Sequence, residues 1–384
     1  MLAGFAAPLS VQRGRLHSCS ARDWSPLSLC KGRFGGEYPG GQCRSAASFS
    51  LVAADAAPES EVPFRGDASV PADPRCCFVS ILGPSNTGKS TLLNAMVGSK
   101  VAIVSPKVQT TRFQVKGIVI EAPLQAQIVF IDTPGVFLAR RRLDRAMVKS
   151  AWDASKGSDI VLLVLDGNRY HHFRKLSQAE ASIAEKLSKV SKEALAETPV
   201  ILAINKVDLL PRKDRDMVLN GMLSEMGSTE RIRETHLVSA RTGEGVPELR
   251  RRLAEMAPPG PWLYDRDQLS DIPERLLAAE VVREQLYLQL RQELPYECAV
   301  ETERWETKED GSVIIGCVIY VKRQSQKGIV AGAEGTRIKS IGTKARLELE
   351  QMLGKRVHLL TFIKCRNWDE KPGLYRQMGL EFRA

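Results

Sequence analysis

The most informative stretch of this chain is Gly83-Pro84-Ser85-Asn86-Thr87-Gly88-Lys89-Ser90. It fits the pattern G-x-x-x-x-G-K-[ST] at each fixed position, between the apolar run Cys77–Leu82 and a stretch of helical character, Thr91–Val97. Glycines permit a tight turn whose backbone N–H groups face a chain of phosphates, and the following helix adds the positive end of its dipole. The stretch therefore predicts a phosphate-binding loop between a buried strand and a helix.

Individual residues of this loop have separate expected roles. Lys89 should reach the β- and γ-phosphates, and the Ser90 hydroxyl should bind Mg²⁺. The other residues expected to contact the nucleotide here are Gly83, Asn86, Thr87, Gly88 and Thr91. The predicted ligand is a nucleoside triphosphate with a magnesium ion.

More apolar runs follow along residues 75–255, separated by helical stretches. They are Gln127–Ile131, Ile160–Leu165, Val200–Ile204 and His236–Val238. Buried parallel strands have this composition, and their alternation with helices places helices on both faces of the sheet. The pattern predicts a doubly wound, mostly parallel α/β sheet, with polar residues at the strand ends forming the ligand-binding edge.

One of these strand ends carries Asp132-Thr133-Pro134-Gly135. The Asp132 carboxylate can hold the Mg²⁺ shell, and Gly135 can offer a backbone N–H to the γ-phosphate. The same residue types form ordinary turns. Because a phosphate-binding loop precedes them in the chain, we favour the nucleotide role.

A second strand end, Asn205-Lys206-Val207-Asp208, indicates guanine. A carboxylate only accepts hydrogen bonds, and guanine offers two adjacent donors where adenine has none. Asp208 would therefore select the base, Lys206 would lie along it, and Asn205 would brace the phosphate loop. Ser239 and Ala240 complete the set, with the Ala240 N–H expected to reach the guanine carbonyl.

With these motifs in this order, the chain resembles the translation-factor-like GTPases, specifically the Era family, in which a G domain precedes a C-terminal KH domain. Val104–Arg112 (VSPKVQTTR) resembles the first switch of that family. The resemblance implies that Thr110 or Thr111 closes over the γ-phosphate and Mg²⁺, and we choose Thr111. The implied metal ligands and catalytic groups are then Ser90, Thr111 and Asp132, and Lys89, Thr111 and Gly135, respectively.

Two positions bear on the rate of hydrolysis. Val136 stands where many GTPases have a glutamine that orients the attacking water, so we expect slow intrinsic hydrolysis. Asn86 stands where related GTPases use an asparagine to hold an activating K⁺, which makes K⁺ a further predicted ligand. Ser85 occupies the place where the family usually has proline.

Residues 273–384 predict an RNA-binding domain after a linker over 256–272. Pro273 opens a helical stretch, and the strand-like runs Tyr296–Thr307 and Ser312–Lys322 follow. Beyond a further helical stretch come the turn Gly332–Gly335 (G-x-x-G), a helix and the strand Val357–Ile363. This order is that of a KH domain of the bacterial type (type II), which clamps unpaired nucleotides beside the turn.

Charge supports a nucleic-acid partner for this domain, since residues 322–366 hold eleven basic and three acidic side chains. The predicted RNA-binding residues are Lys327, Gly328, Gly332, Gly335, Arg337 and Lys339. Glu334 places a negative charge inside the turn, where the family commonly has a basic residue, and it should weaken phosphate contact locally.

The chain has 384 residues and a formal net charge of +10. The composition of its N-terminal segment does not predict a folded domain. Residues 1–44 are rich in Arg and Ser and poor in acids, which is typical of an organellar transit peptide. A disordered basic tail is the alternative, and residues 45–74 read as a disordered linker. No apolar run is long enough to cross a bilayer, and the eight scattered cysteines are expected to be reduced thiols.

Resemblance to Era implies a function: a monomer that binds the 3′ end of small-subunit rRNA and assists assembly of the small ribosomal subunit. The leader implies an organelle, with the mitochondrial matrix favoured and the plastid stroma as alternative. Two other functions stay open. One is an RNA-binding chaperone with nucleotide as a structural ligand, and the other is a GTPase whose basic domain binds a protein or, peripherally, a membrane surface.

Overall fold

The computed structural model describes residues 73–137, 142–189, 198–227, 231–368 and 380. The leader predicted over 1–44 and nearly all of the linker predicted over 45–74 lie outside these residues. Among the described helices, none is long and apolar enough to cross a membrane.

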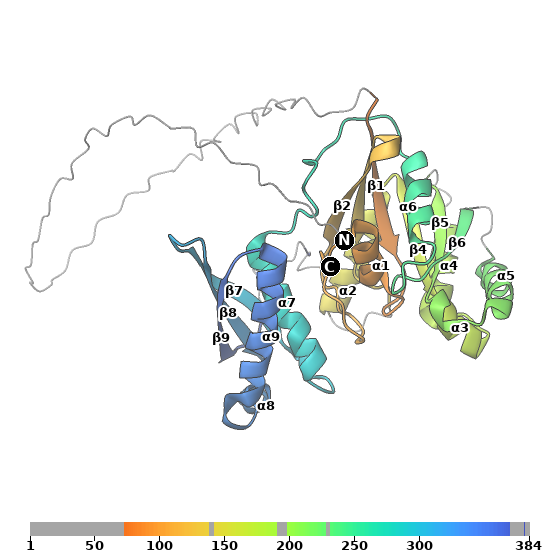
Figure 1. Ribbon diagram of the computed structural model, residues 1–384. Coiled ribbons are helices and arrows are strands. Elements are labelled where there is room, and N and C mark those ends of the chain that lie inside the picture. The colour runs from red at the N-terminus through yellow and green to blue at the C-terminus, as the bar shows by residue number, and fades with distance from the viewer. Residues whose placement is uncertain (1–72, 138–141, 190–197, 228–230, 369–379, 381–384) are drawn as a thin grey trace, which may run out of the picture. The chain divides into compact units, whose positions relative to one another are not determined.

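A six-stranded sheet forms the centre of the first domain, in the order β2-β3-β1-β4-β5-β6 (Figure 1). Its strands are β1 (Arg75–Leu82), β2 (Val115–Glu121), β3 (Ala126–Asp132), β4 (Ile160–Asp166), β5 (Val200–Asn205) and β6 (Ile232–Leu237). Strand β2 runs antiparallel to β3, and every other neighbouring pair is parallel. The predicted, mostly parallel α/β sheet is confirmed.

Strand β2 is absent from the predicted set of strands. Its sequence, VKGIVIE, places Lys116 and Gly117 among its apolar residues, so it lacks the continuous apolar run of the central strands. Gly117 allows helix α1 (Lys89–Val97) to pack closely on this strand, because a Cβ there would lie 2.5 Å from Leu93 Cδ1. An edge strand of this kind can be identified from the elements that it pairs and packs with, but not from its own residue composition.

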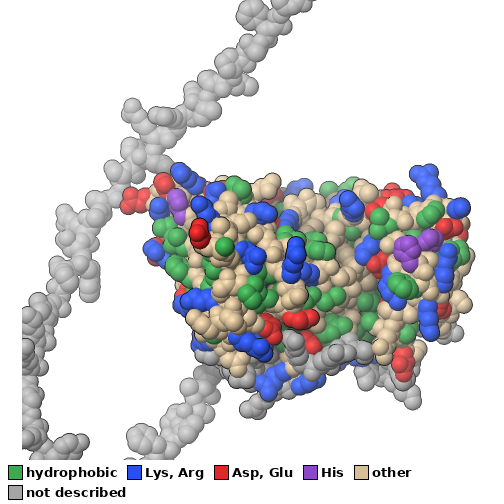
Figure 2. All heavy atoms as spheres, turned by 90° about the horizontal axis from the view of Figure 1, so that it is seen from below, with side chains coloured by type: hydrophobic (Ala, Val, Ile, Leu, Met, Phe, Trp, Pro, Cys, Tyr) green, Lys and Arg blue, Asp and Glu red, His purple; other side chains and the backbone are tan. Residues whose placement is uncertain are grey.

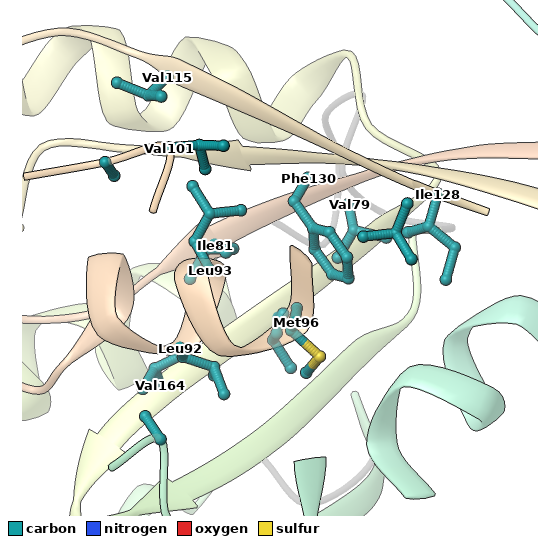
Figure 3. Close-up of a cluster of buried hydrophobic side chains, with 14 of the residues drawn as sticks. Val79, Ile81, Leu92, Leu93, Met96, Val101, Val115, Ile128, Phe130 and Val164 are labelled. Carbon is teal, nitrogen blue, oxygen red and sulfur yellow. The ribbon is translucent and has the colours of Figure 1, made fainter. Parts of the chain in front are cut away.

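Helices cover both faces of the sheet. Besides α1 they are α2 (Arg142–Lys156), α3 (Gly167–Phe173), α4 (Gln178–Lys189), α5 (Arg215–Met226) and α6 (Val246–Glu255). Helices α1 and α6 pack on one face, and α3, α4 and α5 pack on the other. Figure 3 shows the first of these cores, where Val79 and Phe130 of the sheet face Met96 of α1. Each such buried side chain contributes roughly 1.5–3 kcal/mol to stability.

A three-stranded sheet forms the second domain, in the order β7-β8-β9 (Figure 1). Its elements are α7 (Glu274–Gln289), β7 (Ala299–Thr307), β8 (Val313–Val321), α8 (Gln324–Ala331), α9 (Thr336–Leu353) and β9 (Val357–Cys365). Strands β7 and β8 are antiparallel, whereas β8 and β9 are parallel. Alternate residues of β8, among them Ile315, Cys317 and Ile319, are buried in one core with α7 and α9. The element order predicted for a KH domain is confirmed.

The first strand of this domain starts later than predicted. Tyr296 lies in a 3₁₀ turn, Leu294–Glu297, and the strand begins only at Ala299. Pro295 near the start of that turn explains the difference, because its ring fixes φ and it has no N–H for a strand ladder. The five cysteines that the structure describes are free thiols, as predicted, and burial raises the pKa of Cys77 to about 12.

Candidate nucleotide site and nucleic-acid interface

The loop between β1 and α1 packs tightly against the neighbouring strands of the sheet. Gly83 and Gly88 both have positive φ, 148° and 93°. A Cβ on Gly83 would lie 2.2 Å from the Val164 carbonyl oxygen, and one on Gly88 would lie 2.4 Å from Asn205 Nδ2. Glycine is therefore required at both positions, by conformation and by space.

Lys89 is almost completely buried inside this loop. Its ammonium donates to the carbonyl oxygens of Gly83 (3.1 Å) and Pro84 (2.8 Å). Burial lowers the pKa of Lys89 to about 8, and the nearby Asp132 carboxylate offsets part of that effect. The chain thus holds a cation, with little water around it, at the base of a pocket whose lining includes Gly88, Ser90, Thr91 and Gly135.

Three oxygen-bearing side chains predicted to bind Mg²⁺ lie together beside Lys89. Ser90 Oγ donates to Asp132 Oδ2 at 2.6 Å and lies 2.8 Å from Thr111 Oγ1, which is 3.2 Å from the same carboxylate oxygen. Asp132 is fully buried, and its second oxygen has no partner among the described residues. Burial raises the pKa of Asp132, against the lowering effect of Lys89.

These groups suit magnesium, which prefers oxygen ligands, keeps several waters and uses one or two carboxylates together with substrate phosphates. The orphaned Asp132 oxygen offers a place for such a shell, and a divalent cation would favour the charged carboxylate. No cluster of three or more metal-binding His, Cys, Asp or Glu side chains occurs in the part of the chain that the structure describes.

Thr110 and Thr111, the two candidates in the first switch, point to different partners. The Thr111 hydroxyl lies within hydrogen-bonding distance of Ser90 Oγ and Asp132 Oδ2. Thr110 Oγ1 donates to the Lys107 carbonyl oxygen at 2.9 Å and lies 2.6 Å from Ser105 Oγ. The structure therefore places Thr111, not Thr110, at the predicted metal shell.

The predicted guanine side of the site is organised by Asn205. Its amide Nδ2 donates to the Thr87 carbonyl oxygen at 2.8 Å, which braces the phosphate loop as expected. Its Oδ1 accepts from the N–H groups of Lys206 and Ala240, at 2.8 and 2.9 Å. The Ala240 N–H is thus bonded within the protein here, where we expected it to reach the guanine carbonyl.

Asp208, predicted to select the base, is held by a neighbouring hydroxyl. Ser239 Oγ donates to Asp208 Oδ1 at 2.7 Å, which fixes the orientation of the carboxylate that we predict to accept from guanine. Lys206 has a positive φ of 69°, and its ammonium donates to Asp166 Oδ2 and to the Asn86 carbonyl oxygen, at 2.5 and 2.7 Å. Asp166 was not predicted, although an acid at the carboxyl end of buried strand β4 is the same signal that identified Asp132.

Residues 104–112 are also held by side chains that the sequence did not single out. Arg112 donates to the Cys298 carbonyl oxygen at 2.9 Å, and the Val104 N–H donates to Glu284 at 2.8 Å. Arg283, which is paired with Glu280, donates to the Thr110 carbonyl oxygen at 2.6 Å. No short motif predicts these contacts, because the two residues of each pair lie 173 to 186 positions apart in the sequence.

The G-x-x-G turn of the second domain joins α8 to α9. Gly332, Glu334 and Gly335 all have positive φ, at 76°, 50° and 75°. A Cβ on Gly332 would lie 2.7 Å from Arg337 Cβ, so glycine is required there by space as well. Glu334 is exposed and, unlike the glycines, adopts this conformation at a cost in backbone strain.

The predicted RNA-binding cations flank this turn. Lys327 on α8 and Lys339 on α9 are exposed, whereas half-buried Arg337 donates to the Ile329 carbonyl oxygen. Gly328 lies on α8 with open space beside its Cα. Figure 2 shows Lys and Arg side chains dispersed among apolar ones over the face that it presents. The predicted RNA-binding residues thus lie on α8, on α9 and in the turn between them.

Comparison with known families agrees with the assignment of both domains. Residues 78–206 match the family described as 50S ribosome-binding GTPase, and residues 293–369 match the KH domain. The GTPase Era of Bradyrhizobium sp. (strain ORS 278) is 48% identical over 309 residues, covering 80% of this chain and 95% of the relative. The GTPase Era of Agrobacterium fabrum is also 48% identical over 309 residues, covering 80% and 92%.

Two solved structures share the fold at similar coverage. Era in complex with MgGDPNP and nucleotides 1506–1542 of 16S ribosomal RNA gives a TM-score of 0.72 at 33% identity, covering 80% of this chain and 99% of that one. An Aquifex aeolicus Era variant bound to GDP·AlF₄⁻ gives 0.70 at 32% identity, covering 79% and 99%. Fold, motifs and relatives together define a GTPase with a C-terminal KH domain. The chain belongs to the Era family of GTPases.

Proposed function

We propose that this GTPase binds the 3′ end region of small-subunit rRNA and assists assembly of the small ribosomal subunit in an organelle. The observation that carries the proposal is that one chain combines a glycine-rich loop, with Thr111 beside Ser90 and Asp132, and a G-x-x-G turn between two helices. The printed description of the similar Era complex, with MgGDPNP and 16S rRNA nucleotides 1506–1542, supports this choice of RNA.

In this proposal the nucleotide acts as a timer. GTP and Mg²⁺ would be held by Lys89, Ser90, Thr111 and Asp132, and Mg²⁺ would offset the negative charge of the phosphates. RNA binding would be favoured in that state, and hydrolysis to GDP would release the factor. The Val136 side chain cannot hydrogen-bond water, so we expect the intrinsic rate to be slow.

K⁺ is part of the same proposal. The Asn86 amide Nδ2 lies 3.2 Å from the Pro106 carbonyl oxygen in the first switch. Rotation of that amide by half a turn would present two oxygens to a monovalent cation. Hydrolysis measured in potassium and then in sodium at equal ionic strength tests this, with equal rates counting against a K⁺ site.

The main test is binding of the purified chain to a short RNA from the 3′ end of the small-subunit rRNA. Affinity is compared with GDPNP, with GDP and without nucleotide at fixed salt, because phosphate contacts make affinity salt-dependent. The proposal expects tightest binding with GDPNP, weakened about tenfold in Gly332→Asp and in Gly335→Asp. Gly354→Asp is the matched control, since Gly354 also has a positive φ, 62°, with nothing within 4 Å of a built Cβ.

Other outcomes would lead to the alternatives. Equal RNA binding in all three nucleotide states would contradict the timer. Hydrolysis absent with and without RNA would favour the chaperone with a structural nucleotide. Binding to anionic vesicles or to a protein, without RNA binding, would favour a surface partner for the basic domain. The monomeric state that we propose is checked by light scattering.

The proposed location in an organelle is supported by the composition of residues 1–44 and by the similar proteins. The leader is rich in Arg and Ser, and the similar Era proteins are alphaproteobacterial. We therefore propose the mitochondrial matrix, with the plastid stroma as alternative. A fusion of residues 1–74 to a fluorescent protein tests this, and a fusion that stays in the cytosol would contradict a transit peptide.

A further inference from the structure

Ser85 has a buried hydroxyl that lacks a hydrogen-bond partner. It is the third residue of the phosphate loop, and its Oγ has almost no solvent-accessible surface and no partner among the described residues. The residue nevertheless lines the same pocket as Lys89, Thr111 and Gly135. Buried hydroxyls are nearly always bonded, so an orphan that lines a ligand pocket points to a partner supplied by the ligand.

Gly135 lies directly against this serine. A Cβ built on Gly135 would fall 2.7 Å from Ser85 Oγ, 2.8 Å from its Cα and 2.9 Å from its backbone nitrogen. The two loops are also tied by a hydrogen bond from the Val136 N–H to the Gly83 carbonyl oxygen, at 3.0 Å. Ser85 therefore lies at the side of the pocket where Gly135 would offer its N–H to the γ-phosphate.

The neighbouring hydroxyl groups of Thr87 and Ser90 already donate hydrogen bonds within the protein, in contrast to that of Ser85. Thr87 Oγ1 donates to the Pro84 carbonyl oxygen at 3.1 Å, and Ser90 Oγ donates to Asp132. The Val136 side chain is buried in the core and is aliphatic, so it offers no donor. The Ser85 hydroxyl is thus without a partner in the protein, on the Gly135 side of the pocket.

We propose that Ser85 is a γ-phosphate-contacting residue: its hydroxyl donates a hydrogen bond to an oxygen of the third phosphate, beside Gly135. GDP has no oxygen at this place, so the hydroxyl is satisfied only in the GTP state. The contact makes Ser85 a residue that distinguishes GTP from GDP, in addition to the switch threonine and Mg²⁺. It acts on nucleotide discrimination and does not depend on which RNA the chain binds.

The test uses the full chain, and measures its affinity for GDPNP and for GDP with Mg²⁺ present. Ser85→Ala should weaken GDPNP binding by roughly tenfold to a hundredfold, the range for a hydrogen bond to a charged group, and leave GDP binding within about twofold. Ser80→Ala is the matched control, because Ser80 Oγ is also buried without a partner but lies in β1 and does not line the pocket. It should change neither affinity.

Ser85→Cys tests the donor separately from the space, since a thiol has a similar shape and is a weak donor. It should also reduce the preference for GDPNP while GDP binding is retained. Unchanged discrimination in either variant would overturn the proposal. Equal losses for GDP and GDPNP would overturn it as well, because they would mean that Ser85 only shapes the loop.

Discussion

Two glycine turns in this molecule each precede a helix, but their surroundings differ. The phosphate loop, ending at Gly88 before α1, is enclosed by buried polar side chains, including Lys89, Asp132 and Asn205. The G-x-x-G turn, ending at Gly335 before α9, has exposed Glu334 at its tip and nothing closer than 4.0 Å to a Cβ on Gly335. The same local geometry therefore serves two kinds of recognition.

The two turns suit different ligands because the phosphate loop is enclosed by protein and the G-x-x-G turn is open to solvent. A closed loop fixes each donor around one small ligand in a medium of low dielectric, where hydrogen bonds and charges are strong. An open turn lets a long backbone approach from solvent, where charges are screened by salt and contribute less each. Substitutions in the phosphate loop should thus have larger effects than substitutions in the RNA turn.

Lys89→Ala should give the largest effect. The substitution removes a buried cation that holds the loop through two carbonyl oxygens and would reach the γ-phosphate. Hydrolysis of GTP should fall by about a thousandfold, as for loss of a preorganised donor to the transition state. Single-turnover hydrolysis measures it. Lys116→Ala, which removes a partly exposed lysine paired with Asp271, is the control and should hydrolyse normally.

Asp208→Asn should give the second-largest effect. It replaces the acceptor that we expect to read both guanine donors by an amide that repels one of them. GTP affinity should fall by about a hundredfold, and affinity for xanthosine triphosphate should rise. Competition binding with the two nucleotides measures the change. An unchanged preference for GTP would refute the assignment of Asp208.

Gly332→Asp should have an intermediate effect on RNA binding. A side chain there meets Arg337, and its negative charge faces the approaching phosphates. RNA affinity should fall about tenfold, while GTP hydrolysis without RNA stays normal. Electrophoretic mobility shift and a hydrolysis assay on the same preparation distinguish a local effect from misfolding. Loss of both activities would contradict two separate sites.

Glu334→Lys should give the smallest effect and in the opposite direction. The side chain is exposed at the tip of the turn, so reversing its charge should raise RNA affinity by only about threefold. The slope of log affinity against log salt should become steeper by roughly 0.7 for each new phosphate contact. Titration at several salt concentrations gives both quantities. A weaker affinity in the variant would mean that Glu334 itself contacts the RNA.

Much of this architecture could be predicted because its signals are local. The phosphate loop, the two acidic strand ends and the G-x-x-G turn each depend on a few adjacent residues with special backbone or charge requirements. Strand β2 could not be predicted in the same way, since its pairing with β3 and its contact with α1 involve residues far along the chain.

Side-chain type and spacing were enough to predict the element order of both domains apart from β2, phosphate roles for Lys89 and Ser90, and a guanine role for Asp208. Tertiary packing was needed to distinguish Thr110 from Thr111, to pair Lys206 with Asp166, and to bring the Ser85 hydroxyl against Gly135 without a partner. These outcomes depend on distances between loops that follow different strands, and such distances are set by how the sheet and its helices pack.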